Sequence, residues 1–233
     1  MIKMNSGKPY LMAHAGGKKH GKENSVKSVR SCGKYKPDIL ELDLRKSKDG
    51  VLFCYHGFPD FPVFFMAYFL RFLKFGTIKK YLKVNTLREV LDAVNWKAIV
   101  FLDIKQTNIT GEEIDGICSK YKMEFWLAFY KFRYFDLLKE DLEDSYKYIY
   151  NFGFMNFRRG FKKVKRNGLD AMKVFSWQCS EKNMKMLKDT KSAYTVQPMF
   201  TSRKKMKKLI KKYGSLWIAL DDMSKPEKLL RTR

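Results

Sequence analysis

Short apolar runs alternate with polar, helix-like segments along most of the chain. Helices are expected near residues 24–32, 86–96, 110–120, 132–142, 155–167, 180–189 and 201–213. Buried strands are expected at residues 10–14, 38–44, 98–104, 123–130, 145–150, 171–177, 193–197 and 216–220. Strands that alternate with helices form parallel βα units, and eight such units predict a closed barrel. We therefore expect residues 1–233 to fold as one α/β domain, a single (β/α)8 or TIM barrel.

The second expected strand carries charged side chains inside an apolar run. In the sequence D-I-L-E-L-D-L at 38–44, a single leucine separates Glu41 from Asp43. Residues two apart on a strand point to the same side, so both carboxylates are predicted to face the barrel interior. Leu40 and Leu42 are predicted to face the helix layer. Residues 51–56 predict a further short strand, an extension of its neighbour, that ends at His56.

Residues 58–76 are rich in aromatic side chains and do not follow the alternation of strands and helices. Their uninterrupted apolar run, residues 63–70, is too short to span a membrane, which takes about 20 residues. We expect a small aromatic-rich insert after the second-strand region that packs over the barrel mouth. The alternative left open is a segment that lies in a lipid interface, flanked by Arg71 and Lys74, and makes a peripheral membrane contact.

Charge narrows the classes of partner. The chain has 48 Lys and Arg against 24 Asp and Glu, a formal net charge of +24, which favours phosphate esters, anionic membranes or nucleic acid. The basic stretch at 203–212 has its apolar residues on one helix face, so its lysines are interpreted as a solvated barrel surface. No nucleic-acid-binding motif is present, and no specific nucleic-acid partner is expected. Scattered cysteines and an N-terminus without an apolar signal-peptide core predict a cytoplasmic protein.

Three carboxylates fall on two of the expected strands. Glu41 and Asp43 lie on the second, and Asp103 lies near the end of the strand at 98–104. Closure of a barrel would bring them together, and oxygen ligands of this kind suit Mg²⁺ or Ca²⁺. Lys105 shares the inward phase of Asp103 and is expected to hold a phosphate oxygen. Taken alone, Asp103 could equally be a helix cap or a salt-bridge partner.

Two histidines stand at strand ends, where an α/β barrel collects its chemistry. His14 ends the first strand and His56 ends the extension of the second. They are candidates for base and acid on either side of a scissile P–O bond. A single histidine at a strand end is more often structural, so the hypothesis depends on the pair occurring together with the carboxylates. His20 lies in a Lys/Gly-rich loop and is expected to be exposed to solvent.

These residues resemble the glycerophosphodiester phosphodiesterase family. That family opens with His-Arg-Gly and Glu-Asn-Thr, followed by Glu-Leu-Asp, a Lys-Asp-Gly turn and a second histidine. The corresponding motifs here are H-A-G at 14–16, E-N-S at 23–25, E-L-D at 41–43, K-D-G at 48–50 and His56. The family's later Glu-x-Lys is similar to D-I-K at 103–105, and its late tryptophan is similar to Trp177. The similarity spans most of the chain.

The resemblance implies a TIM barrel that hydrolyses glycerophosphodiesters to glycerol 3-phosphate and an alcohol, with Mg²⁺ or Ca²⁺ as cofactor. Members are thought to let a glycerol hydroxyl attack phosphorus, giving a cyclic phosphate that water then opens. The implied roles are acid–base chemistry for His14 and His56, metal binding for Glu41, Asp43 and Asp103, and contact with substrate or phosphate for Lys105, Trp177, Glu23 and Asn24.

The resemblance is incomplete at three positions. Ala15 replaces the family's arginine, for which Lys18, Lys19 or Arg45 are candidate substitutes. Gly57 follows the second histidine where an aspartate is usual, and Asp103 is one methylene shorter than glutamate. Two alternatives therefore stay open: a lysophospholipase-D-like enzyme that acts on lipids, and a non-catalytic barrel that binds anionic lipid or nucleic acid.

Overall fold

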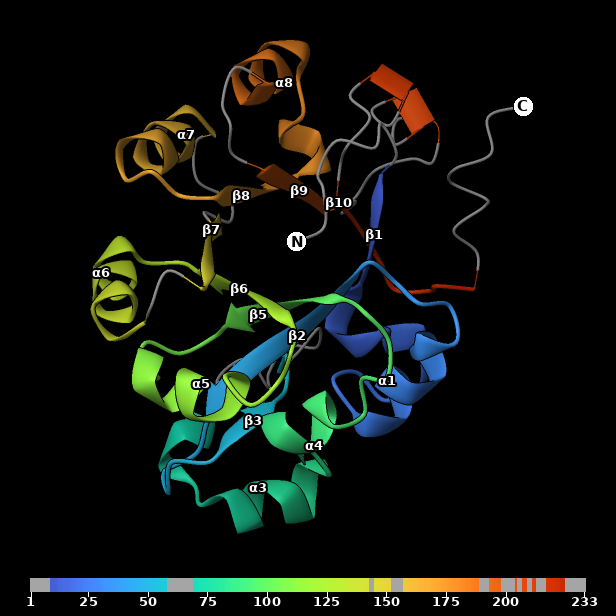
Figure 1. The fold of residues 1–233 in the computed structure, drawn as a ribbon, viewed down its shortest axis with the longest axis vertical. Helices are drawn as coiled ribbons and strands as arrows, with labels where there is room; N and C mark the ends of the chain where they lie inside the picture. The colour runs from blue at the N-terminus through green and yellow to red at the C-terminus, as the bar shows by residue number, and fades with distance from the viewer. Residues whose placement is uncertain are drawn as a thin grey trace.

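A closed ring of parallel strands forms the centre of the molecule (Figure 1). The computed structural model describes residues 9–57, 69–142, 145–151, 157–188, 193–197, 204, 207–208, 211–212 and 217–224. The ring consists of β1 (Tyr10–Ala13), β2 (Ile39–Lys46), β5 (Ile99–Ile104), β6 (Glu124–Phe129), β7 (Lys147–Asn151), β8 (Ala171–Phe175), β9 (Ala193–Gln197) and β10 (Trp217–Leu220). β1 pairs in parallel with β10 on one side and with β2 on the other, which closes the barrel. The eight strands expected from the sequence are confirmed, as is the TIM-barrel fold.

Two short strands extend the sheet beyond the ring. β3 (Leu52–Cys54) pairs antiparallel with the C-terminal half of β2, and β4 (Asn85–Thr86) pairs antiparallel with β3. This confirms that residues 51–56 continue their neighbour and do not form a barrel strand. The extension begins where β2 leaves the barrel, so it carries the chain from β2 to His56 along the barrel mouth.

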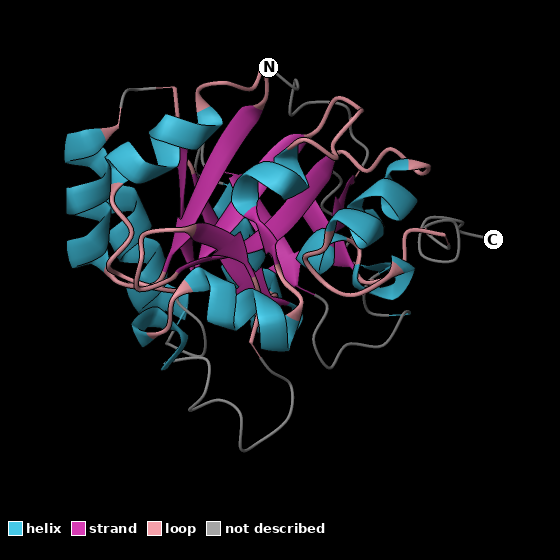
Figure 2. Cartoon of the chain, turned by 90° about the horizontal axis from the view of Figure 1, so that it is seen from below, coloured by secondary structure: helices cyan, strands magenta, loops and turns pink. Residues whose placement is uncertain are grey.

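Helices surround the ring (Figure 2). They are α1 (Val26–Gly33), α3 (Phe75–Leu82), α4 (Leu87–Leu91), α5 (Gly111–Cys118), α6 (Phe132–Asp141), α7 (Phe157–Arg166) and α8 (Glu181–Lys188), with 3-10 turns η1 (His14–Gly16), η2 (Lys18–His20), η3 (Leu70–Phe72) and η4 (Ser176–Gln178). α5 begins at the expected capping sequence, because the Thr110 hydroxyl accepts from the Glu113 N–H while the Glu113 carboxylate accepts from the Thr110 N–H. The helix expected at 201–213 falls largely outside the described residues.

The two faces of β2 lie in different environments. Leu40, Leu42 and Leu44 pack in the large cluster between the strands and the helices. Ile39 belongs to a second cluster inside the barrel. This cluster includes Trp126 and Trp217, whose rings meet edge to face with their centroids 4.6 Å apart. Since side chains alternate along a strand, Glu41 and Asp43 share the inward phase of Ile39. The predicted phase of this strand is confirmed.

The first part of the aromatic insert, residues 58–68, lies outside the described residues. The rest of it packs beside the barrel extension: Leu70 of η3 and Ile78 of α3 are buried against Phe53 of β3. The backbone N–H of Lys48 donates to the Leu73 carbonyl at 2.9 Å, which joins this segment to the turn after β2. None of the helices in the described parts of the chain has the length and apolar character needed to cross a bilayer.

Candidate active site

Three buried carboxylates meet inside the barrel. Asp43 on β2 lies in register with Asp103 on β5, and Glu41 precedes Asp43 by one inward position. One oxygen from each lies within 4.8 Å of the others. Glu41 Oε1 and Asp103 Oδ1 accept no hydrogen bond from the described residues. Buried anionic oxygens are costly without compensation, and three converging carboxylates suit a hard divalent cation. The donor set therefore fits a metal ion of this kind.

Two lysines also reach the carboxylates. Lys105 Nζ lies 2.8 Å from Asp43 Oδ1 and 2.9 Å from Asp103 Oδ2. Lys173 Nζ, on β8, lies 3.0 Å from Asp103 Oδ2 and 3.9 Å from Glu41 Oε1. Burial lowers the pKa of each lysine, but the neighbouring carboxylates raise it more, so the net pKa of both is raised. Both ammonium groups are therefore charged, and they balance part of the negative charge.

The loop after β1 holds the two carboxylates of β2. The Asn24 amide donates to Asp43 Oδ2 at 2.7 Å, and its carbonyl oxygen accepts from the Asp43 backbone N–H at 3.0 Å. The Ala15 N–H donates to Glu41 Oε2 at 2.5 Å. Asn24 and Ala15 have φ values of 56° and 48°, and asparagine adopts this left-handed region more readily than most residues. The side chain of Asn24 thus fixes the rotamer of Asp43.

The charges of the two β2 carboxylates differ. Burial raises the pKa of Asp43, but Lys105, His56 and His14 lower it more, so its net pKa is well below the ordinary range. Burial and the charge of Asp43 raise the pKa of Glu41. Two adjacent carboxylates in one buried site do not ionise equally. Asp43 is thus the more strongly ionised of the pair.

The two histidines face each other across the barrel mouth. Their ring centroids lie 6.4 Å apart with planes at 70°. His14 Nδ1 lies 2.7 Å from Asp221 Oδ1, directly after β10, which leaves Nε2 as its second ring nitrogen. Burial lowers the pKa of His14, whereas Glu41 and the Asp221 hydrogen bond raise it, and the net result is a pKa above 6.5. The Arg45 guanidinium donates to the backbone carbonyls of Tyr55 and His56, at 3.0 and 2.9 Å, and so holds the loop that carries the second histidine.

Two further predicted site residues, Trp177 and Glu23, lie on segments that adjoin elements of this cluster. Trp177 in η4 is half-exposed and stacks on Phe175, with ring centroids 6.0 Å apart and planes 8° apart. Phe175 shares the inward phase of Lys173 on β8. Glu23 lies beside Asn24 in the loop after β1 and pairs with Lys18 at 3.7 Å.

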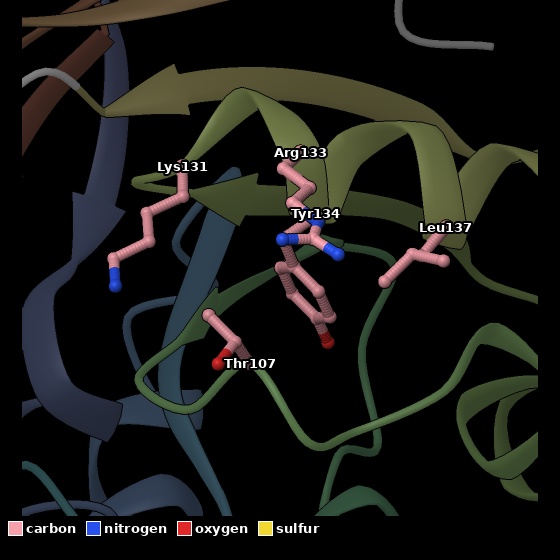
Figure 3. Close-up of a pocket in the computed structure, with 5 residues that line it drawn as sticks. All are labelled: Thr107, Lys131, Arg133, Tyr134 and Leu137. Atoms are coloured by element: carbon pink, nitrogen blue, oxygen red, sulfur yellow. The ribbon is translucent and has the colours of Figure 1, made fainter.

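A cavity of about 340 Å³ lies near the start of α6 (Figure 3). Its lining residues are Thr107, Lys131, Arg133, Tyr134 and Leu137. Figure 3 shows the side chains of Arg133, Tyr134 and Leu137 coming from the start of α6, with Lys131 extending away from them. The described lining includes neither the carboxylates nor the histidines, so this cavity is separate from the cluster.

Residues 14–136, more than half of the chain, match the Glycerophosphoryl diester phosphodiesterase family. The chain belongs to this family. The matched region begins at His14 and includes all three carboxylates, Lys105 and His56. Membership makes the chain an enzyme of the phosphodiesterase class. No curated protein matches the sequence.

Solved structures with this family's name share the fold. A Galdieria sulphuraria protein assigned to the glycerophosphodiester phosphodiesterases has a TM-score of 0.79 and 18% identity, covering 95% of this chain and 96% of its own. The Thermotoga maritima glycerophosphodiester phosphodiesterase has a TM-score of 0.73 and 18% identity, with coverage of 92% and 95%. An Oleispira antarctica phosphodiesterase, in complex with the product sn-glycerol-3-phosphate, has a TM-score of 0.77 and 13% identity, with coverage of 98% and 99%. At these identities the likeness establishes the fold.

The structure brings seven of the predicted site residues of this family member together: His14, Asn24, Glu41, Asp43, His56, Asp103 and Lys105. Glu23 adjoins Asn24 in the sequence, and Trp177 follows the strand that carries Lys173. The structure also adds three residues that the sequence did not suggest. The additions are Lys173, Tyr130, whose hydroxyl lies 3.2 Å from Asp103 Oδ2, and Asp221. A lysine within the apolar run A-M-K-V-F at 171–175 was a usable signal, as was an aspartate directly after the last strand. The prediction that His20 is solvent-exposed was wrong: its side chain is 12% exposed, because its Nε2 accepts from the Met223 N–H beyond β10.

Proposed function

We propose that this chain hydrolyses glycerophosphodiesters to glycerol 3-phosphate and an alcohol at the carboxylate–histidine cluster. The observation that carries the proposal is the convergence of Glu41, Asp43 and Asp103 below the facing rings of His14 and His56. The Oleispira phosphodiesterase that shares the fold binds sn-glycerol-3-phosphate as product, which agrees with this substrate class. Mg²⁺ or Ca²⁺, held by the three carboxylates, would polarise a phosphoryl oxygen and neutralise its developing charge.

His14 and His56 would move the protons. The Asp221 carboxylate accepts from His14 Nδ1, which leaves the Nε2 lone pair to take a proton from the attacking hydroxyl. His56, on the loop held by Arg45, would give its proton to the departing alkoxide. The proposed nucleophile is a glycerol hydroxyl, so the first product is a cyclic phosphate. Water then opens it with the two histidines exchanging roles.

The remaining predicted residues would bind or position. Lys105, already charged between Asp43 and Asp103, would hold a phosphoryl oxygen. Trp177 would line the substrate pocket at the rim. Glu23 stays a proposed substrate contact, whereas Asn24 would act through Asp43, since both polar atoms of its amide bond that residue. A cytoplasmic location stays a prediction from the sequence.

An activity screen tests the proposal. Purified protein is incubated with glycerophosphocholine, glycerophosphoethanolamine, glycerophosphoglycerol and lysophospholipids, with EDTA, Mg²⁺ or Ca²⁺, and glycerol 3-phosphate is measured. We expect EDTA to abolish turnover and His14→Ala or His56→Ala to lower kcat by about 10²–10⁴, the usual contribution of a general acid or base. Lys122→Ala, at an exposed position before β6, is the control. Chelator-insensitive turnover, or unchanged turnover in both histidine variants, would contradict the proposal.

A lipid substrate is the second candidate. The observation that favours it is a group of exposed aromatic side chains next to the barrel extension, at residues 69–81. Turnover of lysophospholipids with no turnover of the water-soluble diesters in the same screen would select a lysophospholipase-D-like reaction. Phosphorus NMR that detects a transient cyclic phosphate would support the two-step route for either substrate.

A further inference from the structure

Residues 69–83, which we name the basic–aromatic face, expose an unusual set of apolar side chains. The exposed fractions are 54% for Phe69, 52% for Phe72, 41% for Leu73 and 72% for Tyr81. Single exposed apolar residues are normal on a soluble domain, but several together indicate a contact surface. The face comprises η3 and α3, at the edge of the molecule beside β3 and α4 (Figure 1).

The residues of this face carry charge of one sign, and of its cations Lys79 pairs with Glu89 of α4 at 3.0 Å. Its fifteen residues contain five cations and no acidic residue; the cations are Arg71, Lys74, Lys79, Lys80 and Lys83. Several of them lie directly against the rings. The Arg71 guanidinium lies 4.8 Å from the Phe72 centroid, and the Lys80 ammonium lies 5.5 Å from that of Tyr81. Cations and aromatic rings are therefore interleaved on the same surface.

The opposite side of the same segment is firmly anchored. Leu70 and Ile78 are buried against Phe53, so the exposed rings do not result from a segment that lacks a core. The Phe75 N–H donates to Asp49 Oδ1 at 2.8 Å, and Lys22 Nζ donates to the Lys83 carbonyl at 3.2 Å. Asp49 and Lys22 belong to the loops that leave the C-terminal ends of β2 and β1. The face is thereby fixed next to the barrel mouth.

We propose that the basic–aromatic face docks on an anionic lipid bilayer. Rings and an exposed leucine surrounded by lysines match the boundary between headgroups and acyl chains, where aromatic and aliphatic groups are buried and cations meet anionic lipid. A nucleic acid could bind the same cations, but the exposed apolar side chain of Leu73 makes no favourable contact with a phosphate backbone. The sequence left a lipid contact in 58–76 open as an alternative; the surface proposed here lies in 69–83 and continues through α3 to Lys83. Docking goes beyond the hydrolysis proposed above and does not depend on it.

Vesicle co-sedimentation tests the docking. Wild-type protein is mixed with pure phosphatidylcholine vesicles or with vesicles that also contain phosphatidylserine. We expect binding to the anionic vesicles and a partition coefficient that falls about fivefold per lysine removed, so about 25-fold for Lys74→Gln/Lys80→Gln. The matched control is Lys120→Gln/Lys122→Gln. These two exposed lysines precede β6, at the end of the barrel opposite its mouth. Binding of this control variant should change far less.

A second pair of variants separates insertion from diffuse charge attraction. Phe72→Ser/Leu73→Ser should weaken binding that persists at high salt, whereas Leu137→Ser, an exposed leucine on α6, should not. Equal losses in face and control variants, or absence of vesicle binding by the wild type, would overturn the proposal. RNA binding that is lost with the lysines, without vesicle binding, would overturn it in favour of nucleic acid. Turnover of glycerophosphocholine should be unchanged in the face variants, so a failure here is distinct from a failure of the proposed hydrolysis.

Discussion

Replacing Lys173 with methionine should leave negative charge in the buried carboxylate cluster uncompensated and so destabilise the folded protein. The ammonium lies 3.0 Å from Asp103 Oδ2 and 3.9 Å from Glu41 Oε1, and it is buried. Removing one partner of a buried ion pair costs about 3–5 kcal/mol. Lys105 and Tyr130 still reach Asp103, so we expect the lower end, about 3 kcal/mol. For a chain of this size that loss lowers Tm by about 6–12 °C.

The loss should depend on divalent cations. Without the ammonium, the cluster carries one more negative charge, and Mg²⁺ or Ca²⁺ should bind it more tightly than in the wild type. A cation at 100 times its Kd stabilises the folded state by about 2.7 kcal/mol, enough to restore most of the lost Tm. Differential scanning calorimetry in EDTA, Mg²⁺ and Ca²⁺ measures both effects without reference to activity.

The control is Lys147→Met on the neighbouring strand β7. Lys147 pairs with Asp170 at 3.7 Å, but both side chains are partly exposed to solvent, 40% and 33%, so this variant should change stability by at most about 1 kcal/mol. The reasoning is refuted if Lys173→Met is as stable as the wild type in EDTA. It is also refuted if Mg²⁺ and Ca²⁺ raise the Tm of Lys173→Met and the Tm of the wild type by the same amount.

Three further predictions concern neighbouring groups. Asn24→Ala removes both hydrogen bonds to Asp43 and should lower the free energy of unfolding in urea by about 2–4 kcal/mol, together with kcat/KM. Glu41 and the hydrogen bond to Asp221 both raise the pKa of His14, and Asp221→Asn weakens that hydrogen bond, so this pKa should fall in an NMR titration; the stability from the raised pKa is present below 6.5 and lost as pH rises through the folded value. Burial raises the pKa of Cys32 to about 11, so iodoacetamide at mildly alkaline pH should label it slowly until the chain is unfolded.

Each of these has an outcome that would contradict it. Full activity in Asn24→Ala would show that Asp43 keeps its position without the amide. An unchanged His14 titration in Asp221→Asn would show that the Asp221 hydrogen bond does not contribute to the raised pKa. Rapid alkylation of Cys32 in the folded protein would show that its site is open to solvent.

Much of the fold followed from local patterns, because each barrel strand is an apolar run between helical segments. The period of two along β2 also gave the inward phase of Glu41 and Asp43 before any partner was known. Contacts made only by closure could not be predicted in this way. Lys173 lies 70 residues from Asp103, and within A-M-K-V-F its phase says only that it faces inward.

The partners of the histidines could not be predicted from local sequence patterns either. His14 and Asp221 are 207 residues apart, and only the pairing of β1 with β10 makes them neighbours. His20 was placed in solvent because its own loop is polar and rich in glycine. The segment after β10 covers it, and the local sequence pattern around His20 contains no information about a contact with so distant a segment.

Because β1 pairs with β10, the barrel can close only after β10 has been synthesised. A nascent chain that has reached residue 105 already holds the three carboxylates, Lys105 and both histidines, but Asp221 has not yet been made. The partner of His14 arrives with the last described strand, β10, so the proposed base is oriented only when the ring closes. A ribosome-bound chain in which β10 has not yet paired with β1 would thus carry an incomplete proton-transfer site.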